Sequence, residues 1–189
     1  MAEFSEKGFD GARVDKIAKS AEVNINLVYH YFLSKEDLFV AVMEQAYRII
    51  RSHHKDMELR ELEPATAMAE LVRATFRMFV RHLDIINLLN SENIHEARHI
   101  RKSEEIAQLY NPLLDFISDI LQRGVAAGDF RPGLDPVELF ISINAECYFY
   151  LSNRHTLGFI IHQDLMAPDR LDQREAHIVE VILAFIRAR

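Results

Sequence analysis

The chain has 189 residues, 49% hydrophobic and 27% charged, which is the balance of a globular protein and excludes a disordered one. Six glycines and five prolines are too few for the many turns of a β-sandwich or β-barrel, so the composition favours long helices. The net charge of −7 argues against a nucleic-acid partner, because DNA affinity comes largely from Lys and Arg.

Two further absences bound the class of protein. A single cysteine, Cys147, excludes an internal disulfide framework and a cysteine-rich metal site, and we interpret it as a small buried apolar residue. There is no signal-peptide pattern, and no apolar run is long enough to cross a membrane. We therefore expect a cytoplasmic protein with no membrane partner.

The first 40 residues predict short helices. Residues 2–7 have the pattern of a helix end, with Gly8 as a left-handed cap, and we expect the beginning of this helix to be missing. Residues 13–20 and 25–32 predict two short helices joined by a tight turn. Such a pair is typical of a helix-turn-helix, whose second helix enters the major groove of DNA.

Two capping signals place the helices that follow this turn. Asn24 is a good N-cap for the helix over residues 25–32. Ser34, with Asp37 three residues later, resembles a capping box with Asp in place of Glu.

The rest of the chain is predicted to be helical. Pro64 begins a helix that we expect to run to about Leu83, and residues 84–109 predict one or two shorter helices. Three later helices are expected. They begin at Asn111-Pro112 and stop at Gly128, begin at Asp135-Pro136, and run from about Arg170 to Arg187.

Two late segments, residues 139–151 and 178–186, are apolar nearly all round. A surface helix has one apolar stripe, and a chain of this size has little protein to cover two. Either these helices are fully central, or each turns one face to the core and the other to an identical subunit. We favour the second interpretation, a homodimer formed through the last two helices.

The second helix of the short pair predicts a DNA-reading surface. Asn26 could read an adenine edge, and Ile25 or Leu27 could touch a thymine methyl group. Tyr29, Tyr31 and Lys35 lie where hydroxyl and ammonium groups could hold phosphates. We expect apolar side chains to join the two helices, and the candidates are Ile17, Ala18, Ala21, Val23, Val28 and Phe32.

Residues 4–39 resemble the DNA-binding head of the tetracycline-repressor-like (TetR) family. The matching features are Phe4 and Gly8, the pair Ile17-Ala18, Tyr29 with Phe32, and the Ser-Lys-Glu at 34–36 with Leu38. Where the family commonly has glycine in the turn, this chain has Glu22, so that backbone must tolerate a side chain. With the N-cap included, the candidate DNA-binding residues are Arg13, Asn24, Ile25, Asn26, Leu27, Tyr29, His30 and Lys35.

The resemblance also implies a second helical domain with an effector pocket. Polar residues on otherwise apolar helices are the candidates to line it, namely His82, Asn90, Asn93, Asn144, Tyr148 and His155. Asn144, Tyr148 and His155 are expected to lie roughly in line along one helix.

Residues 95–99 read His-Glu-Ala-Arg-His, the pattern by which zinc proteases place two imidazoles on one helical face. Arg98 between the two histidines is unfavourable beside a dication, and no third ligand follows clearly. We therefore expect no metal site here, with His95 and His99 as weak candidates, and a metal-dependent hydrolase using His95, Glu96 and His99 remains an alternative.

The predicted fold is all-α, with a helix-turn-helix head over residues 1–39 and a helical effector-binding and dimerisation domain over residues 40–189. The predicted function is a regulator, not an enzyme, that binds palindromic double-stranded DNA and is released by a small-molecule effector, with no cofactor. A helical interaction protein without DNA binding is a further alternative. Residues 1–40 carry five Lys or Arg and seven Asp or Glu, so we expect weak nonspecific DNA binding.

Overall fold

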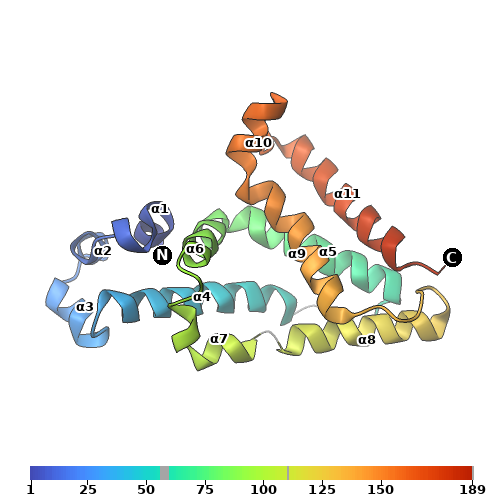
Figure 1. The fold of residues 1–189 in the computed structure, drawn as a ribbon, viewed down its shortest axis with the longest axis horizontal. Helices are drawn as coiled ribbons and strands as arrows, with labels where there is room; N and C mark the ends of the chain where they lie inside the picture. Colours follow the sequence, from blue (N-terminus) through green and yellow to red (C-terminus); the bar gives the residue numbers. More distant parts are fainter. Residues whose placement is uncertain (56–59, 110, 189) are drawn as a thin grey trace. The chain divides into compact units, whose positions relative to one another are not determined.

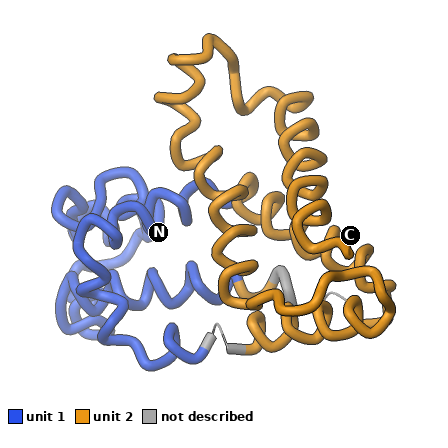
Figure 2. The backbone as a smooth tube through the Cα atoms, turned by 45° about the vertical axis from the view of Figure 1, so that its right-hand side comes forward, with its two compact units in different colours: residues 1–50, 82–109 blue, residues 51–81, 110–189 orange. Residues whose placement is uncertain are grey.

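The computed structural model describes residues 1–55, 60–109 and 111–188, which divide into two compact units (Figures 1 and 2). Unit 1 contains residues 1–50 and 82–109, and unit 2 contains residues 51–81 and 110–189. The described residues form helices and no β-strand, apart from an isolated bridge between Phe130 and Arg187, which confirms the all-α prediction. Among the described helices, none combines the length and apolar character needed to cross a membrane.

Unit 1 is built around aromatic side chains that join its first helix to its longest one. Its helices are α1 (Ala2–Gly11), α2 (Val14–Ser20), α3 (Ile25–Tyr31), α4 (Lys35–Lys55, which continues past Ile50), α6 (Leu83–Ile94), a 3-10 helix η1 (Ile100–Lys102) and α7 (Glu104–Leu109). The ring of Phe39 lies 5.0 Å from that of Phe4 and 5.2 Å from that of Phe9. Helix α1 also packs on α6, where the Phe9 N–H donates to Ser91 Oγ.

Unit 2 is a bundle in which α5 contacts three other helices, α8, α9 and α11. Its helices are α5 (Pro64–Arg81), α8 (Asn111–Ala127), α9 (Pro136–Ser152), α10 (Arg154–Ile161) and α11 (Pro168–Ile186). Its core contains aliphatic side chains, such as Leu71, Ile117 and Ile178, and aromatic ones, such as Phe76 and Phe79. Position 124 on α8 requires glycine, because a Cβ there would lie 2.0 Å from the Phe130 ring.

Several helices end with a residue in the left-handed region. These residues follow α2, α6, α8 and α10 and are Glu22, Glu96, Gly128 and His162, with φ of 57°, 56°, 81° and 55°. In each case the hydrogen bonds are those of a Schellman motif, such as the Val23 N–H donating to the Ala18 carbonyl. Three of these four caps carry a side chain where glycine is usual, so a search for glycine does not find them.

The structure corrects four predictions of local structure. Gly8 has φ 68° as expected, but it kinks α1 and the helix resumes to Gly11. The helix that begins at Pro64 ends at Arg81, before Leu83.

The third correction concerns the helix after residue 152, where the backbone of Asn153 leaves helical geometry, with φ −100° and ψ 9°, and α9 ends. His155 therefore lies on α10, not in line with Asn144 and Tyr148. Fourth, Ala21 and Val23 lie exposed in the turn and do not join the helix-turn-helix core, because the Schellman bonds hold that backbone at the surface.

Candidate functional site

The helix-turn-helix of unit 1 is held by its own backbone and one side-chain cap. The Asn24 side chain accepts the Asn26 N–H at 2.8 Å, which confirms the predicted N-cap of α3. At the other end of the turn, Glu22 takes the left-handed conformation that closes α2. Ala18 and Val28 are buried between the two helices. These contacts fix the turn, and α3 itself contains no Asp, Glu, Lys or Arg.

Helix α3 exposes nearly all of its side chains. Val28 is its one buried residue, whereas Leu27 is 45% and Tyr29 43% exposed. Seven of the eight candidate DNA-binding residues lie exposed, and Lys35 is half-buried. Such exposure of apolar side chains costs solubility and leaves them free to meet base edges. Six of the candidates lie on α3 or at its N-cap, whereas Arg13 is the N-cap residue of α2 and Lys35 begins α4. Their roles in DNA binding remain predictions.

The two candidate cations, Arg13 before α2 and Lys35 at the start of α4, already have partners within unit 1. The guanidinium of Arg13 donates to both carboxylate oxygens of Asp15, at 3.0 and 2.9 Å. The ammonium of Lys35 donates to the Asp10 carbonyl at 3.2 Å and lies 5.0 Å from the centre of the Phe9 ring. A phosphate would have to compete with Asp15 for Arg13, whereas Lys35 retains further N–H donors.

The start of α4 is capped by the side chain of Ser34. The Ser34 hydroxyl accepts the Asp37 N–H at 3.1 Å and donates to Asp37 Oδ2 at 2.6 Å, so the predicted capping interaction is present. Because the side chain of Ser34 accepts the Asp37 N–H, this backbone donor at the start of α4 is not available to a phosphate.

The His-Glu-Ala-Arg-His segment is not helical. Helix α6 ends at Ile94, and Glu96 and Ala97 both have positive φ, so His95 and His99 are not one turn apart on a helix. In the described part of the chain, no group of three or more His, Cys, Asp or Glu could hold a metal ion. The geometry that a zinc protease needs is therefore missing from this motif, because the α6 cap interrupts it.

His95 and His99 have other partners, which differ between the two rings. His95 Nδ1 lies 2.7 Å from the Ser91 carbonyl oxygen and Nε2 lies 3.1 Å from Asp10 Oδ2, so both ring nitrogens face acceptors. The Ser91 carbonyl first, and then Asp10, raise the pKa of His95. His95 is therefore favoured in its charged form.

His99 is fully buried, and Glu92 surrounds it with acceptor oxygens. Glu92 Oε1 accepts the His99 and Ile100 N–H groups at 2.8 and 3.0 Å, and Oε2 lies 2.6 Å from His99 Nδ1. The other ring nitrogen, Nε2, faces the Arg98 guanidinium at 3.3 Å. Glu92 thus binds both the backbone and the ring of His99, and the cluster closes the end of α6.

The six candidate effector residues are divided between the two units. His82, Asn90 and Asn93 lie in unit 1, and Asn144, Tyr148 and His155 lie in unit 2. The amide groups of Asn93 and Asn144 donate to the carbonyls of Leu89 and Phe140 one turn earlier in their helices. His155 is exposed on α10. Their role in effector binding stays a prediction.

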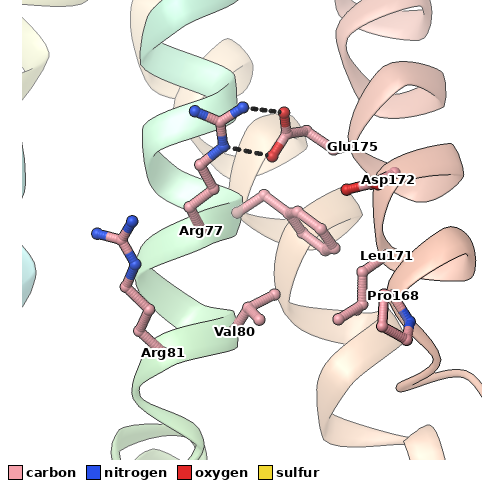
Figure 3. Close-up of a pocket in the computed structure, with 8 residues that line it drawn as sticks. Arg77, Val80, Arg81, Pro168, Leu171, Asp172 and Glu175 are labelled. Atoms are coloured by element: carbon pink, nitrogen blue, oxygen red, sulfur yellow. Dashed lines mark hydrogen bonds and ion pairs between the residues drawn. The ribbon is translucent and has the colours of Figure 1, made fainter.

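Unit 2 contains a cavity of about 280 Å³ between α5 and α11, which none of these six residues lines (Figure 3). Arg77 and Glu175 point toward one another across it and form two hydrogen bonds, at 2.7 and 2.6 Å, whereas Arg81 points away. Its apolar wall consists of Phe76, Val80, Pro168 and Leu171. Sequence reasoning missed this cavity, because it joins segments almost a hundred residues apart and no local pattern marks it.

The lone cysteine is structural. Cys147 lies buried on α9, and burial raises the pKa of its thiol to about 12. A thiol with so high a pKa is a poor nucleophile at neutral pH, which agrees with its interpretation as a small apolar residue.

Comparison with known proteins identifies both parts of the chain. The family described as bacterial regulatory proteins, tetR family, matches residues 1–42, and the tetracyclin repressor-like C-terminal domain matches residues 64–182. The transcriptional repressor NicS of Pseudomonas putida is 35% identical over 86% of this chain and 76% of its own. The regulator RutR of Escherichia coli K12 is 25% identical over 98% of this chain and 86% of its own.

A solved structure shows the same fold at lower identity. The regulator FadR of Bacillus subtilis, in complex with stearoyl-CoA, superposes with a TM-score of 0.67 at 20% identity, over 98% of this chain and 95% of that one. Together with the two family matches and the exposed, capped helix α3, this shows that the chain belongs to the TetR family of DNA-binding transcriptional regulators.

Proposed function

We propose that this protein is a repressor that binds a palindromic operator as a homodimer through α3 and is released by a small-molecule effector. The observation that carries the proposal is α3 itself, a seven-residue helix capped by Asn24 that exposes Ile25, Asn26 and Leu27 within the matched tetR segment. Its uncharged surface is suited to base edges, while the cations lie at its flanks.

The test separates base reading from phosphate contact. After an operator is selected from random DNA, Asn26→Ala should relax preference at one base pair, at a cost of about 1–3 kcal/mol there. Lys35→Ala should weaken all sequences alike and reduce the slope of log K against log salt by about one. Lys7→Ala, an exposed lysine paired with Glu6, is the matched control for charge. Equal effects of Asn26→Ala and Lys35→Ala on every sequence, or no selected palindrome, would contradict the proposal.

The homodimer is supported by apolar side chains exposed on α9 and α11. Ile141 and Phe149 lie eight residues apart on α9, and Phe149 is 57% exposed. Val181 and Phe185 lie one turn apart on α11, and Phe185 is 52% exposed. Each pair is one helical stripe that a single chain leaves in water.

Sedimentation of the full chain tests this face. Phe149→Glu together with Phe185→Glu should convert a dimer to a monomer and weaken operator binding with it, because a two-fold protein reads two half-sites. Gln122→Glu, an added charge at an exposed site on α8, should leave the dimer intact. A dimer that survives the double substitution would place the interface elsewhere.

Effector release is supported by the FadR structure, which holds stearoyl-CoA, and by the cavity between α5 and α11. A ligand can release DNA if it binds better to the geometry that does not fit the operator. Fluorescence anisotropy of the operator complex during titration with small molecules measures this release. Val80→Trp should block release if the effector enters the α5–α11 cavity, and Asn144→Ala or Tyr148→Phe should block it if the predicted polar residues hold the effector instead.

A further inference from the structure

A second cavity in unit 2 has a chemistry that the proposed function does not use. It has a volume of about 360 Å³ and lies where α11 faces the end of α9. Tyr150 lines it from α9, and Arg170, Gln173, Arg174 and His177 line it from α11. The spacing of these four residues places them on one face of the helix. The five side chains all carry N–H or O–H groups, and no carboxylate lines the cavity.

Two donors at this cavity are buried without a partner. In the described part of the chain, the Nε atoms of Arg170 and Arg174 are the buried side-chain atoms that make no hydrogen bond. Each guanidinium is nevertheless held in place on another nitrogen. Arg170 Nη1 donates to Gln173 Oε1 at 2.8 Å, and Arg174 Nη2 donates to Glu146 Oε2 at 2.6 Å. Buried donors in folded proteins almost always have partners, so a pair without them calls for a missing acceptor.

The neighbouring α5–α11 cavity shows what a satisfied arginine looks like in the same unit. There, both Nε and Nη2 of Arg77 donate to the two carboxylate oxygens of Glu175. Arg170, by contrast, has no carboxylate within ion-pair distance among the described residues. Arg174 uses only one nitrogen, Nη2, to bond the carboxylate of Glu146. The cavity at Tyr150 is therefore lined by two arginines that each keep one buried N–H donor unfilled.

The aromatic wall keeps these groups in position. The guanidinium of Arg174 lies 5.4 Å from the centre of the Tyr150 ring, and the Tyr150 hydroxyl donates to the Leu165 carbonyl at 2.8 Å. With Tyr150 anchored and Arg174 stacked near it, little reorganisation is needed for a ligand to meet the donors.

We propose that this cavity binds the oxyanion of a small molecule, a carboxylate or a phosphate, with Arg170 and Arg174 as its main donors. Guanidinium groups match the planar oxygen pair of a carboxylate and the oxygens of a phosphate through parallel N–H donors. Gln173 and His177 add donors at the rim. This binding is independent of operator recognition, so it can succeed or fail without deciding the proposed function.

Calorimetry of the full chain with inorganic phosphate and with benzoate tests the site and distinguishes the two sources of an oxyanion. At least one of them should bind with one site per chain, and benzamide, which has the ring of benzoate without its charge, should bind at least tenfold more weakly than benzoate if the carboxylate is the ligand. Arg170→Gln should weaken binding about tenfold or more. Arg73→Gln, an ion-paired arginine on α5 outside the cavity, should change it less than twofold.

The test uses Arg170 because Arg174 also bonds Glu146, and the loss of that bond would affect folding as well as ligand binding. Arg170→Lys is a second variant at the same position. It keeps the charge but loses the fork, and it should bind more tightly than Arg170→Gln and more weakly than the unaltered chain. The proposal is overturned if neither phosphate nor benzoate binds, or if Arg170→Gln and Arg73→Gln have equal effects. It is also overturned if Arg170→Gln leaves binding unchanged while it shifts the monomer–dimer equilibrium, because the acceptor would then belong to a second copy of the chain.

Discussion

Helix α3 in unit 1 and helix α11 in unit 2 are stabilised in opposite ways. Helix α3 has seven residues and buries only Val28, and its conformation rests on the Asn24 cap and on the turn before it. Helix α11 has nineteen residues and buries four aliphatic side chains along its second half. The difference agrees with the proposed function, because a helix that reads DNA must leave its side chains exposed. Local hydrogen bonds therefore stabilise α3, whereas core packing stabilises α11.

Truncation of the α11 core should give the largest loss of stability. Ile178→Ala removes a fully buried side chain and should lower the free energy of unfolding by about 2–5 kcal/mol. Urea denaturation followed by circular dichroism measures this. Glu180→Ala, exposed on the same helix, should change the value by less than about 0.5 kcal/mol. Similar losses from the two variants would mean that packing does not hold α11.

A buried polar site in unit 1 should be the next most sensitive. Glu92 accepts two backbone N–H groups on Oε1 and faces His99 Nδ1 with Oε2. Glu92→Gln places an amide N–H against one of these donors and should cost about 1–3 kcal/mol in the same urea assay. Glu96→Gln, exposed in the same segment, is the matched control. Full stability of Glu92→Gln would show that the cluster adapts and does not close α6 as described.

The Asn24 cap tests the local side of the comparison directly. Asn24→Ala should cost about 1 kcal/mol, because the Asn26 N–H loses its acceptor, while Asn24→Asp should keep the cap and the stability. Operator affinity should fall with Asn24→Ala even below the temperature at which the chain unfolds, since α3 frays at its first turn. If unfolding and operator binding are both unchanged, the turn alone fixes α3.

The same contrast explains what the amino-acid sequence could reveal. N-caps are local, so Asn24, Ser34 and Asp135 were identified as helix starts and are confirmed by their hydrogen bonds. Helix ends at glycine were also found, as at Gly128. The break at Asn153 and the left-handed cap at His162 carry neither glycine nor proline, so α10 was missed.

Sites that depend on packing were beyond sequence reasoning for a related reason. The exposure of α3 follows from a motif and was predicted, although which side chains contact DNA stays a prediction. The α5–α11 cavity and the cavity at Tyr150 depend on which faces of distant helices meet. The His-Glu-Ala-Arg-His segment is another example. Its two histidines have the spacing of one helical turn, but Glu96 and Ala97 have positive φ, so the segment is not a helix.

The smallest predicted effect concerns pH and the joint between α1 and α6. The Ser91 carbonyl and Asp10 raise the pKa of His95 in the folded chain, so the charged ring binds its proton more tightly there than in the unfolded chain. The stability this adds is fully present below the unfolded pKa of about 6.5, and it is lost as the pH rises through the higher folded pKa. Asp10 is 83% exposed, so solvent screening should limit the contribution to a few tenths of a kcal/mol.

His95→Gln isolates this contribution, because glutamine can donate to one of the two acceptors but does not titrate. The unaltered chain should lose more stability than His95→Gln between pH 6 and pH 8.5 in urea denaturation at fixed salt. The comparison must be a difference of slopes, since the chain has eight histidines besides His95. Parallel slopes would show that the Ser91 and Asp10 contacts do not stabilise charged His95. The joint between α1 and α6 would then rest on the packing of the two helices and on the bond from the Phe9 N–H to Ser91 Oγ.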